Sequence, residues 1–200
     1  MLDEHSLNRV FVLGKSCSGK TTYWINRIKS YNCEYIFVYD PELQFARKVN
    51  RRACCTPEEC FESAMNKRLV IFDPYKMFGS DQVAGLNWFA GWVLAFCSKA
   101  PGVKVFGVDE IQRYVKGGAS KLSPEMQDIW QIGRRYGIDC LVTSNSPSKL
   151  HSDLRLHLTE LVCFRFDDAF ALAWLKKNGV NPNTVKNLKY PGGFISEKLG

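Results

Sequence analysis

Eight consecutive residues near the start of the chain form a pattern that binds phosphate groups. They are Gly14, Lys15, Ser16, Cys17, Ser18, Gly19, Lys20 and Thr21, which fit G-x-x-x-x-G-K-[ST]. In such a loop the backbone N–H groups point inward at an anion, and the following helix adds the positive end of its dipole. We expect Lys20 to reach the β- and γ-phosphates of a nucleoside triphosphate and the Thr21 hydroxyl to ligate Mg²⁺, with Thr22 completing the nucleotide-binding set.

The segments around this motif are the ones that it needs. Residues 10–13 are a short apolar run of strand type, and residues 21–29 can continue as a helix. A strand, a glycine-rich turn and a helix start in this order are typical of a phosphate-binding loop, whereas a surface loop that matches by chance needs neither neighbour. The chain is therefore predicted to bind a nucleoside triphosphate, with ATP and Mg²⁺ as its cofactors.

Two adjacent carboxylates follow a later apolar run. Residues 105–108 lead directly into Asp109 and Glu110. Two acids can simply mark the end of a strand in solvent, but downstream of a phosphate-binding loop they are typical of the Walker B element. Asp109 is expected to hold Mg²⁺ through a water, and Glu110 to orient and polarise the attacking water. The glutamate favours hydrolysis over transfer to a small acceptor, because water needs a base beside the metal.

Further polar candidates surround the next strand. Asn145 ends it, and its amide can bond the γ-phosphate and the attacking water as a sensor; the alternative is an Asn that opens the following Ser-Pro turn. Arg134 and Arg135 precede it, and a guanidinium suits the oxygens of a transferring phosphate, often from a neighbouring subunit. The alternative for both arginines is a solvated helix end. Arg155 is a weaker candidate for the same role.

Strand-like and helix-like runs alternate along the chain, which predicts an α/β fold with a mostly parallel central sheet flanked by helices. Further strands are expected at residues 34–39, 69–72, 103–108, 138–143 and 158–166, and a turn with a terminal strand is expected within residues 190–196. Helices are expected at residues 57–66, 82–99, 124–136 and 167–177, the first opened by a capping box at residues 56–59. We predict a single domain over residues 1–200, with a core at about 8–166 and a C-terminal appendage at about 167–200.

Composition narrows the class of protein. The 200 residues suffice for one full hydrophobic core, and the net charge of +7 favours an anionic partner. None of the eight cysteines forms C-x-x-C, and only Cys54, Cys55 and Cys60 cluster locally. A metal or disulfide there is the lesser expectation, because a nucleotide-hydrolysing fold implies a reducing compartment. The most apolar stretch, residues 86–97, is too short to span a bilayer, so no transmembrane segment is expected.

Together these motifs resemble the FtsK–HerA superfamily of ring-forming, nucleic-acid-pumping ATPases. The resemblance covers about residues 8–166 and rests on the phosphate-binding loop, Asp109 with Glu110, and residues 133–139, 143–145, 148–150 and 153–155. Within the superfamily, the chain looks most like the genome-packaging ATPases of tailless, membrane-containing viruses, with a HerA-like DNA translocase as an alternative. Relatives usually carry Gln at the sensor position, where this chain has Asn145.

The resemblance implies a RecA-like P-loop NTPase of the ASCE type. It also implies a homo-oligomeric ring, expected to be a hexamer, that threads double-stranded DNA into a preformed capsid. The implied partners are capsid or membrane vertex proteins, and the implied location is the virion or the host cytoplasm.

A basic segment at residues 113–121 closely follows Glu110 and is the expected route for the DNA. Arg113, Lys116 and Lys121 are the candidates for contacts with phosphates of the DNA backbone. Such contacts carry no sequence information, so nonspecific, salt-sensitive binding is expected. The alternative is a solvated connector, which would leave Lys76, Lys186 and Lys189 as the next candidates.

Three other functions are compatible with parts of the sequence. A filamentous-phage assembly ATPase of the zonula-occludens-toxin type shares the core, but usually adds a transmembrane segment after it. A small-molecule kinase would need a lid that carries arginine, and has no use for Glu110 beside Asp109. A nucleotide switch or a ring scaffold without hydrolysis is disfavoured by the presence of both Lys20 and Glu110.

Overall fold

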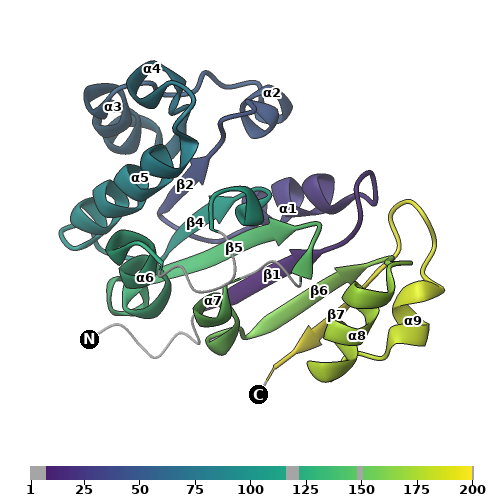
Figure 1. Ribbon diagram of the computed structural model, residues 1–200. Coiled ribbons are helices and arrows are strands. Elements are labelled where there is room, and N and C mark those ends of the chain that lie inside the picture. Colours follow the sequence, from purple (N-terminus) through teal and green to yellow (C-terminus); the bar gives the residue numbers. More distant parts are fainter. Residues whose placement is uncertain (1–7, 116–121, 148–150, 200) are drawn as a thin grey trace.

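The computed structural model describes residues 8–115, 122–147 and 151–199 and is built on one seven-stranded sheet (Figure 1). The strand order is β3-β2-β4-β5-β1-β6-β7. Neighbouring strands are parallel except β6 and β7. The mostly parallel α/β sheet predicted from the sequence is confirmed. The strands are β1 (Arg9–Leu13), β2 (Tyr35–Tyr39), β3 (Leu69–Phe72), β4 (Lys104–Val108), β5 (Ile138–Ser144), β6 (Glu160–Phe164) and β7 (Phe194–Lys198).

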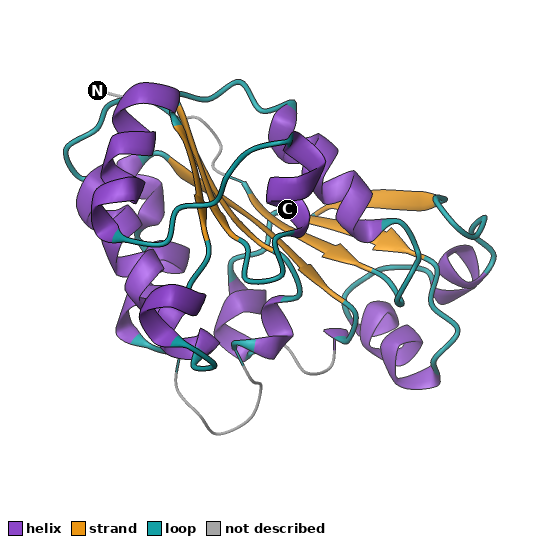
Figure 2. Cartoon of the chain, turned by 90° about the horizontal axis from the view of Figure 1, so that it is seen from above, coloured by secondary structure: helices purple, strands orange, loops and turns teal. Residues whose placement is uncertain are grey.

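Helices cover both faces of the sheet (Figure 2). They are α1 (Lys20–Lys29), α2 (Gln44–Val49), α3 (Pro57–Lys67), α4 (Tyr75–Phe78), α5 (Gln82–Cys97), α6 (Pro124–Gln131), α7 (Ser152–Leu156), α8 (Ala169–Lys177) and α9 (Pro182–Lys186), with 3₁₀ turns at Ile111–Arg113 and Gly133–Tyr136. The short helices α2, α4, α7 and α9 are not predicted from the sequence, because they are too brief to show a helical period.

The alternation of side chains along the strands creates two cores. In β1, Phe11 and Leu13 pack with α3, α5, α6 and α8, whereas Val10 and Val12 pack with α1 and α2 on the other face. All four side chains are completely buried. A strand that is apolar on both faces belongs in the middle of a covered parallel sheet, and β1 lies there between β5 and β6.

The helix predicted to run from residue 124 to residue 136 is in fact divided. α6 ends at Gln131, and a separate 3₁₀ turn carries Arg134 and Arg135. The reason is a competing donor: Arg9 Nε donates to the carbonyl oxygen of Trp130 at 2.8 Å, where a continuing helix would place a backbone N–H. Gly137 then turns the chain into β5 with a φ of 70°.

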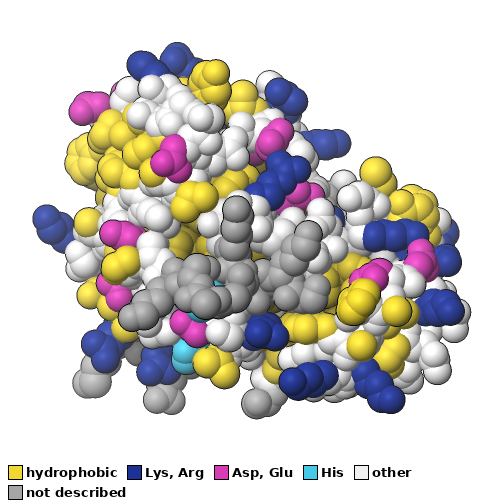
Figure 3. All heavy atoms as spheres, in the orientation of Figure 1, with side chains coloured by type: hydrophobic (Ala, Val, Ile, Leu, Met, Phe, Trp, Pro, Cys, Tyr) yellow, Lys and Arg dark blue, Asp and Glu magenta, His cyan; other side chains and the backbone are white. Residues whose placement is uncertain are grey.

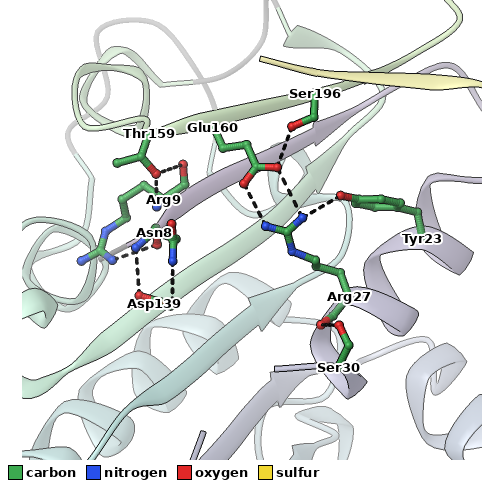
Figure 4. A network of polar contacts seen from close by, with 9 residues as sticks. All are labelled: Asn8, Arg9, Tyr23, Arg27, Ser30, Asp139, Thr159, Glu160 and Ser196. Atoms are coloured by element: carbon green, nitrogen blue, oxygen red, sulfur yellow. Dashed lines mark hydrogen bonds and ion pairs between the residues drawn. The ribbon is translucent and has the colours of Figure 1, made fainter. Parts of the chain in front are cut away.

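Polar contacts tie several strands together at the edge of the sheet where the parallel strands begin (Figure 4). Glu160 at the start of β6 accepts hydrogen bonds from Arg27 of α1 at 2.9 Å and from Ser196 of β7 at 2.7 Å. Asp139 of β5 accepts two hydrogen bonds from Asn8, at 2.9 and 3.0 Å. These charged groups are largely buried but paired, so we infer that they serve the fold.

All eight cysteines are free thiols, and Cys54 and Cys60 are buried in the core. Across residues 8–115, 122–147 and 151–199, no helix is long and apolar enough to cross a membrane.

The Arg27–Glu160 pair generates a stability prediction. Glu160→Ala should lower the free energy of unfolding by about 1–3 kcal/mol, since it leaves the Arg27 side chain, which is one-third exposed, without its carboxylate partner. Urea denaturation monitored by circular dichroism measures this change. Glu197→Ala, at an exposed position on β7, is the control and should change stability much less. Equal effects from the two substitutions would contradict a structural role for the pair.

Candidate functional site

The predicted phosphate-binding loop joins the end of β1 to the start of α1. The Gly14 N–H donates to the carbonyl oxygen of Ser144 at the end of β5, at 3.2 Å, which fixes the loop to that strand. A Cβ on Gly14 would lie 2.6 Å from Ser18 Oγ and 2.6 Å from Phe164 Cβ, so the tight turn admits only glycine there. Gly19 has a φ of 101° and directly precedes α1.

Lys20 and Thr21 begin α1 and face the end of β4. Lys20 is 4% exposed, and burial lowers the pKa of its ammonium while Asp109 and Glu110 oppose that shift. Thr21 Oγ1 donates to Asp109 Oδ2 at 3.1 Å. The structure therefore brings the cation, the hydroxyl and both carboxylates of the prediction to one end of the sheet.

Thr143, in the next-to-last position of β5, organises the two carboxylates. Its hydroxyl donates to Asp109 Oδ1 and accepts from the Glu110 N–H at 2.8 Å. Glu110 itself has a φ of 49°, in the left-handed region that a side chain with a Cβ rarely adopts. Strained backbone of this kind is concentrated at functional sites. The sequence did not indicate a role for Thr143. Its position two residues before the sensor candidate Asn145, at the end of the same predicted strand, was the one signal for it.

The Glu110 carboxylate has contacts on both oxygens. Asn145 Nδ2 donates to Oε1 at 3.4 Å, and Arg113 Nε pairs with Oε2 at 2.5 Å. Gln112 Nε2 donates to Asn145 Oδ1 at 3.1 Å, which orients the amide. The sensor candidate thus lies beside the predicted base, and a guanidinium that sequence analysis assigned to DNA is paired with that base instead.

The described residues fit a nucleoside triphosphate and Mg²⁺. Ser18 Oγ is buried inside the loop and has no hydrogen-bond partner among the described residues, as expected for a hydroxyl that meets a phosphate oxygen. Lys20 supplies a cation in the same place. Thr21 Oγ1 and Asp109 are oxygen donors of the kind that Mg²⁺ takes, and their direct contact agrees with an aspartate that acts through a water.

The candidate arginine fingers lie at the other end of the sheet. Arg134 and Arg135 are exposed on the turn before β5, whereas Thr143 is near the end of that strand. Five residue steps along a strand span about 17 Å. Arg155 on α7 likewise precedes its strand, β6. None of the three can reach the phosphate-binding loop of its own chain, so a finger role requires a second subunit.

A turn near the C-terminus contacts the phosphate-binding loop, which the sequence did not predict. The Tyr190 hydroxyl donates to the carbonyl oxygen of Ser16 at 3.1 Å, and the Gly192 N–H donates to that of Ser18 at 3.0 Å. Lys15 Nζ lies 4.4 Å from the centre of the Tyr190 ring and pairs with Asp167. No local sequence signal links residues so far apart in the chain.

The Asp167 carboxylate lies in the segment between β6 and α8. Its hydrogen bonds with Lys15 and Arg165 lower the pKa of this carboxyl. Lys15 is therefore held on the β6 side of the phosphate-binding loop. Lys20 is the lysine of the loop that faces Asp109 and Glu110.

The predicted DNA-contact residues are only partly within the described chain. Lys116 and Lys121 lie outside it, and Arg113 is 47% exposed but pairs with Glu110 and Glu42. Lys and Arg side chains also gather over α8 and α9, whereas hydrophobic side chains gather over α3 and α5 (Figure 3). Lys186 and Lys189 are exposed in the first of these regions.

No protein-family model matches the sequence, and no curated protein matches it. Several solved structures are similar to this chain in fold. The genome packaging NTPase B204 from Sulfolobus turreted icosahedral virus 2 in complex with sulfate has a TM-score of 0.75 at 16% identity, over 94% of this chain and 90% of that one. B204 from Sulfolobus turreted icosahedral virus, described as a DNA-packaging ATPase, gives 0.72 at 18% identity, over 94% and 91%.

A larger protein also shares the fold. The pCW3 conjugation coupling protein TcpA in complex with ATPγS has a TM-score of 0.62 at 11% identity, over 96% of this chain and 57% of that one. At these identities the comparisons establish a common fold, that of P-loop NTPases.

Two substitutions test the predicted roles of the loop lysine and the second carboxylate. Lys20→Ala should weaken nucleotide binding and lower ATP hydrolysis by roughly a hundredfold or more, since the phosphates lose their buried cation. Glu110→Gln should leave binding intact and lower turnover by roughly 10²–10⁴-fold, since the amide cannot take a proton from water. Fluorescence anisotropy of a labelled ATP analogue and phosphate release measure the two effects.

Exposed residues of the same types provide the controls. Lys29→Ala, at the far end of α1, and Glu62→Gln, on α3, should retain both binding and turnover. A Glu110→Gln variant that hydrolyses ATP at the wild-type rate would show that the Walker B assignment is wrong.

Proposed function

We propose that this protein is an ATPase of the FtsK–HerA type that translocates double-stranded DNA, and that it packages a viral genome. One observation carries the enzymatic part of the proposal: the buried Lys20, the Thr21 hydroxyl, Asp109 and Glu110 meet at the carboxyl end of a parallel sheet. This is where open α/β sheets bind their ligands.

Each side chain has a distinct role in the proposed hydrolysis. Lys20 and the N–H groups of the loop bind the β- and γ-phosphates. Glu110 accepts a proton from water as the water oxygen bonds to the γ-phosphorus and the bond to the β–γ bridging oxygen breaks, which gives ADP and phosphate. Asn145, 3.4 Å from Glu110, positions the same water. Mg²⁺, held by Thr21 and through a water by Asp109, would neutralise charge on the phosphate oxygens.

Support for DNA as the translocated substrate comes from charge and from the structural neighbours. The net charge of +7 suits a polyanion, and B204 is a viral genome packaging NTPase by its own description. Arg113 ends the 3₁₀ turn that follows β4 and pairs with Glu110, so a contact with DNA there would lie beside the proposed catalytic carboxylates. A ring of subunits, expected to be a hexamer, would give the chain a channel for the duplex and bring Arg134 and Arg135 to a neighbouring site.

Stimulation of hydrolysis by duplex DNA tests the translocase function. The rate of ATP hydrolysis should rise when duplex DNA of random sequence is added, and the affinity for DNA should fall with salt by about 0.9 in log–log slope for each phosphate contact. Phosphate release and fluorescence anisotropy measure the two quantities. A hydrolysis rate that does not change when duplex DNA is added at low salt would contradict the proposed DNA motor. The absence of any hydrolysis would contradict the proposed ATPase activity.

Hydrolysis should also depend on protein concentration, because the finger arginine comes from a second subunit. A variant with both Arg134→Ala and Arg135→Ala should be inactive alone, as should Glu110→Gln. A mixture of the two should regain part of the activity, since some interfaces then join an intact Glu110 to an intact pair of arginines. Activity that stays constant at concentrations where sedimentation shows only monomers would disprove the finger in trans.

A further inference from the structure

The predicted base of the reaction is not free in this structure. Arg113 Nε lies 2.5 Å from Glu110 Oε2, and Asn145 Nδ2 lies 3.4 Å from Oε1. A carboxylate acts as a general base through a lone pair that points at the water. The contact with a guanidinium occupies Oε2, so this oxygen is not available to the attacking water.

The local backbone makes this contact. Glu110, in its left-handed conformation, starts the 3₁₀ turn Ile111–Arg113, and the Arg113 N–H donates to the Glu110 carbonyl oxygen at 2.9 Å. Residues three apart are stacked in a 3₁₀ turn, so the side chain of Arg113 lies over that of Glu110. Ile111, Tyr114 and Val115 are buried, which anchors the turn on the core.

A second acid binds the same guanidinium. Arg113 NH1 donates to Glu42 Oε1 at 2.9 Å, and Glu42 comes from the segment that follows β2, the neighbour of β4 in the sheet. Asp40, Glu42, Asp109 and Glu110 line a cavity of about 20 Å³ here, enough for a single water, and Arg113 is the cation among the described residues around it. The Arg113 side chain is nevertheless 47% exposed. Arg113 is therefore both the counter-ion of Glu110 and Glu42 and accessible to an outside anion.

We propose that Arg113 is a positioning residue that couples DNA binding to hydrolysis: a backbone phosphate of duplex DNA takes its guanidinium and thereby frees Glu110. The inference rests on the proposed function and extends it. A guanidinium binds phosphate and carboxylate with the same fork of donors, so the two anions compete for it. When DNA holds Arg113, Glu110 Oε2 becomes available to the attacking water.

Basal hydrolysis without DNA provides the first test. Arg113→Gln should raise kcat by roughly two- to fivefold, the range for a half-exposed ion pair, with KM for ATP unchanged. The ratio of rates with and without duplex DNA should fall to nearly one. Arg113→Lys, which keeps the charge, should restore part of the DNA response. Arg47→Gln removes an equivalent exposed charge from α2 and should preserve the basal rate.

The affinity for DNA, measured without ATP or Mg²⁺, provides the second test. Coupling is reciprocal, so if DNA frees Glu110, removal of the competing acids must strengthen DNA binding. Glu42→Gln and Glu110→Gln should each lower the Kd for duplex DNA by roughly two- to fivefold, whereas Arg113→Gln should raise it. Removal of a negative or a positive charge shifts the Kd in these directions by itself, so Glu62→Gln and Arg47→Gln, which change the charge equally at exposed positions of α3 and α2, are the controls. A purely structural Arg113–Glu110 pair would give changes no larger than these controls. Thermal melts verify that each variant is folded.

The outcomes separate this inference from the proposed function. A lower basal kcat in Arg113→Gln, or a DNA response equal to that of the wild type, would overturn the coupling role. DNA affinity that is unchanged by Glu42→Gln and Glu110→Gln would also overturn it. A wild-type chain that fails to hydrolyse ATP would instead overturn the proposed function, and the DNA affinities of the variants would still decide whether Arg113 exchanges partners.

Discussion

The carboxylate of Asp109 is the point at which three elements of the site are joined. It accepts hydrogen bonds from Thr21 of α1, from Thr143 of β5 and from the N–H of Glu110. One residue after the end of β4 therefore fixes the positions of the phosphate-binding loop, of β5 and of the predicted base, Glu110, relative to one another. A parallel sheet makes this possible, because its strands end at a common edge and side chains from separate crossovers meet there.

Charged side chains have different surroundings at the two edges of the sheet. At the edge where the parallel strands begin, Glu160 is 5% exposed and is bonded to Arg27 and Ser196. At the opposite edge, Asp40, Glu42, Asp109 and Glu110 line one cavity; Arg113 pairs with two of these acids, and Lys20 faces Asp109 and Glu110. Buried charges that are fully paired support a fold, whereas acids in excess over their cations leave a site ready for metal and for proton transfer.

The parts of the site that are formed by residues adjacent in the sequence can be predicted from the sequence. The phosphate-binding loop, the end of β4 and the cap of α3 at Thr56 are each defined by a few adjacent residues, and the structure has the expected elements at all three places. Lys20 and Asp109 are therefore placed together by pattern alone, since parallel strands share an edge.

Contacts between distant segments could not be predicted in the same way. The division of α6 from the turn that carries Arg134 depends on a hydrogen bond from Arg9 to Trp130, residues far apart in the chain. The pairing of Arg113 with Glu110 depends on the left-handed backbone conformation of Glu110, which cannot be predicted from the residue types around it. The contact of Tyr190 with Ser16 joins the two ends of the domain.

The position of β1 has a consequence for how the protein is made. β1 is synthesised before the other six strands, yet its partners in the sheet are β5 and β6. The hydrogen bond to the carbonyl oxygen of Ser18 comes from the N–H of Gly192. A nascent chain that has completed only its phosphate-binding motif therefore lacks both flanking strands and the contact that closes the loop. Long-range parallel pairing of this kind forms late and slowly. We therefore expect the loop to reach its final conformation only after residue 192 has left the ribosome, so shorter translation products would lack a closed loop.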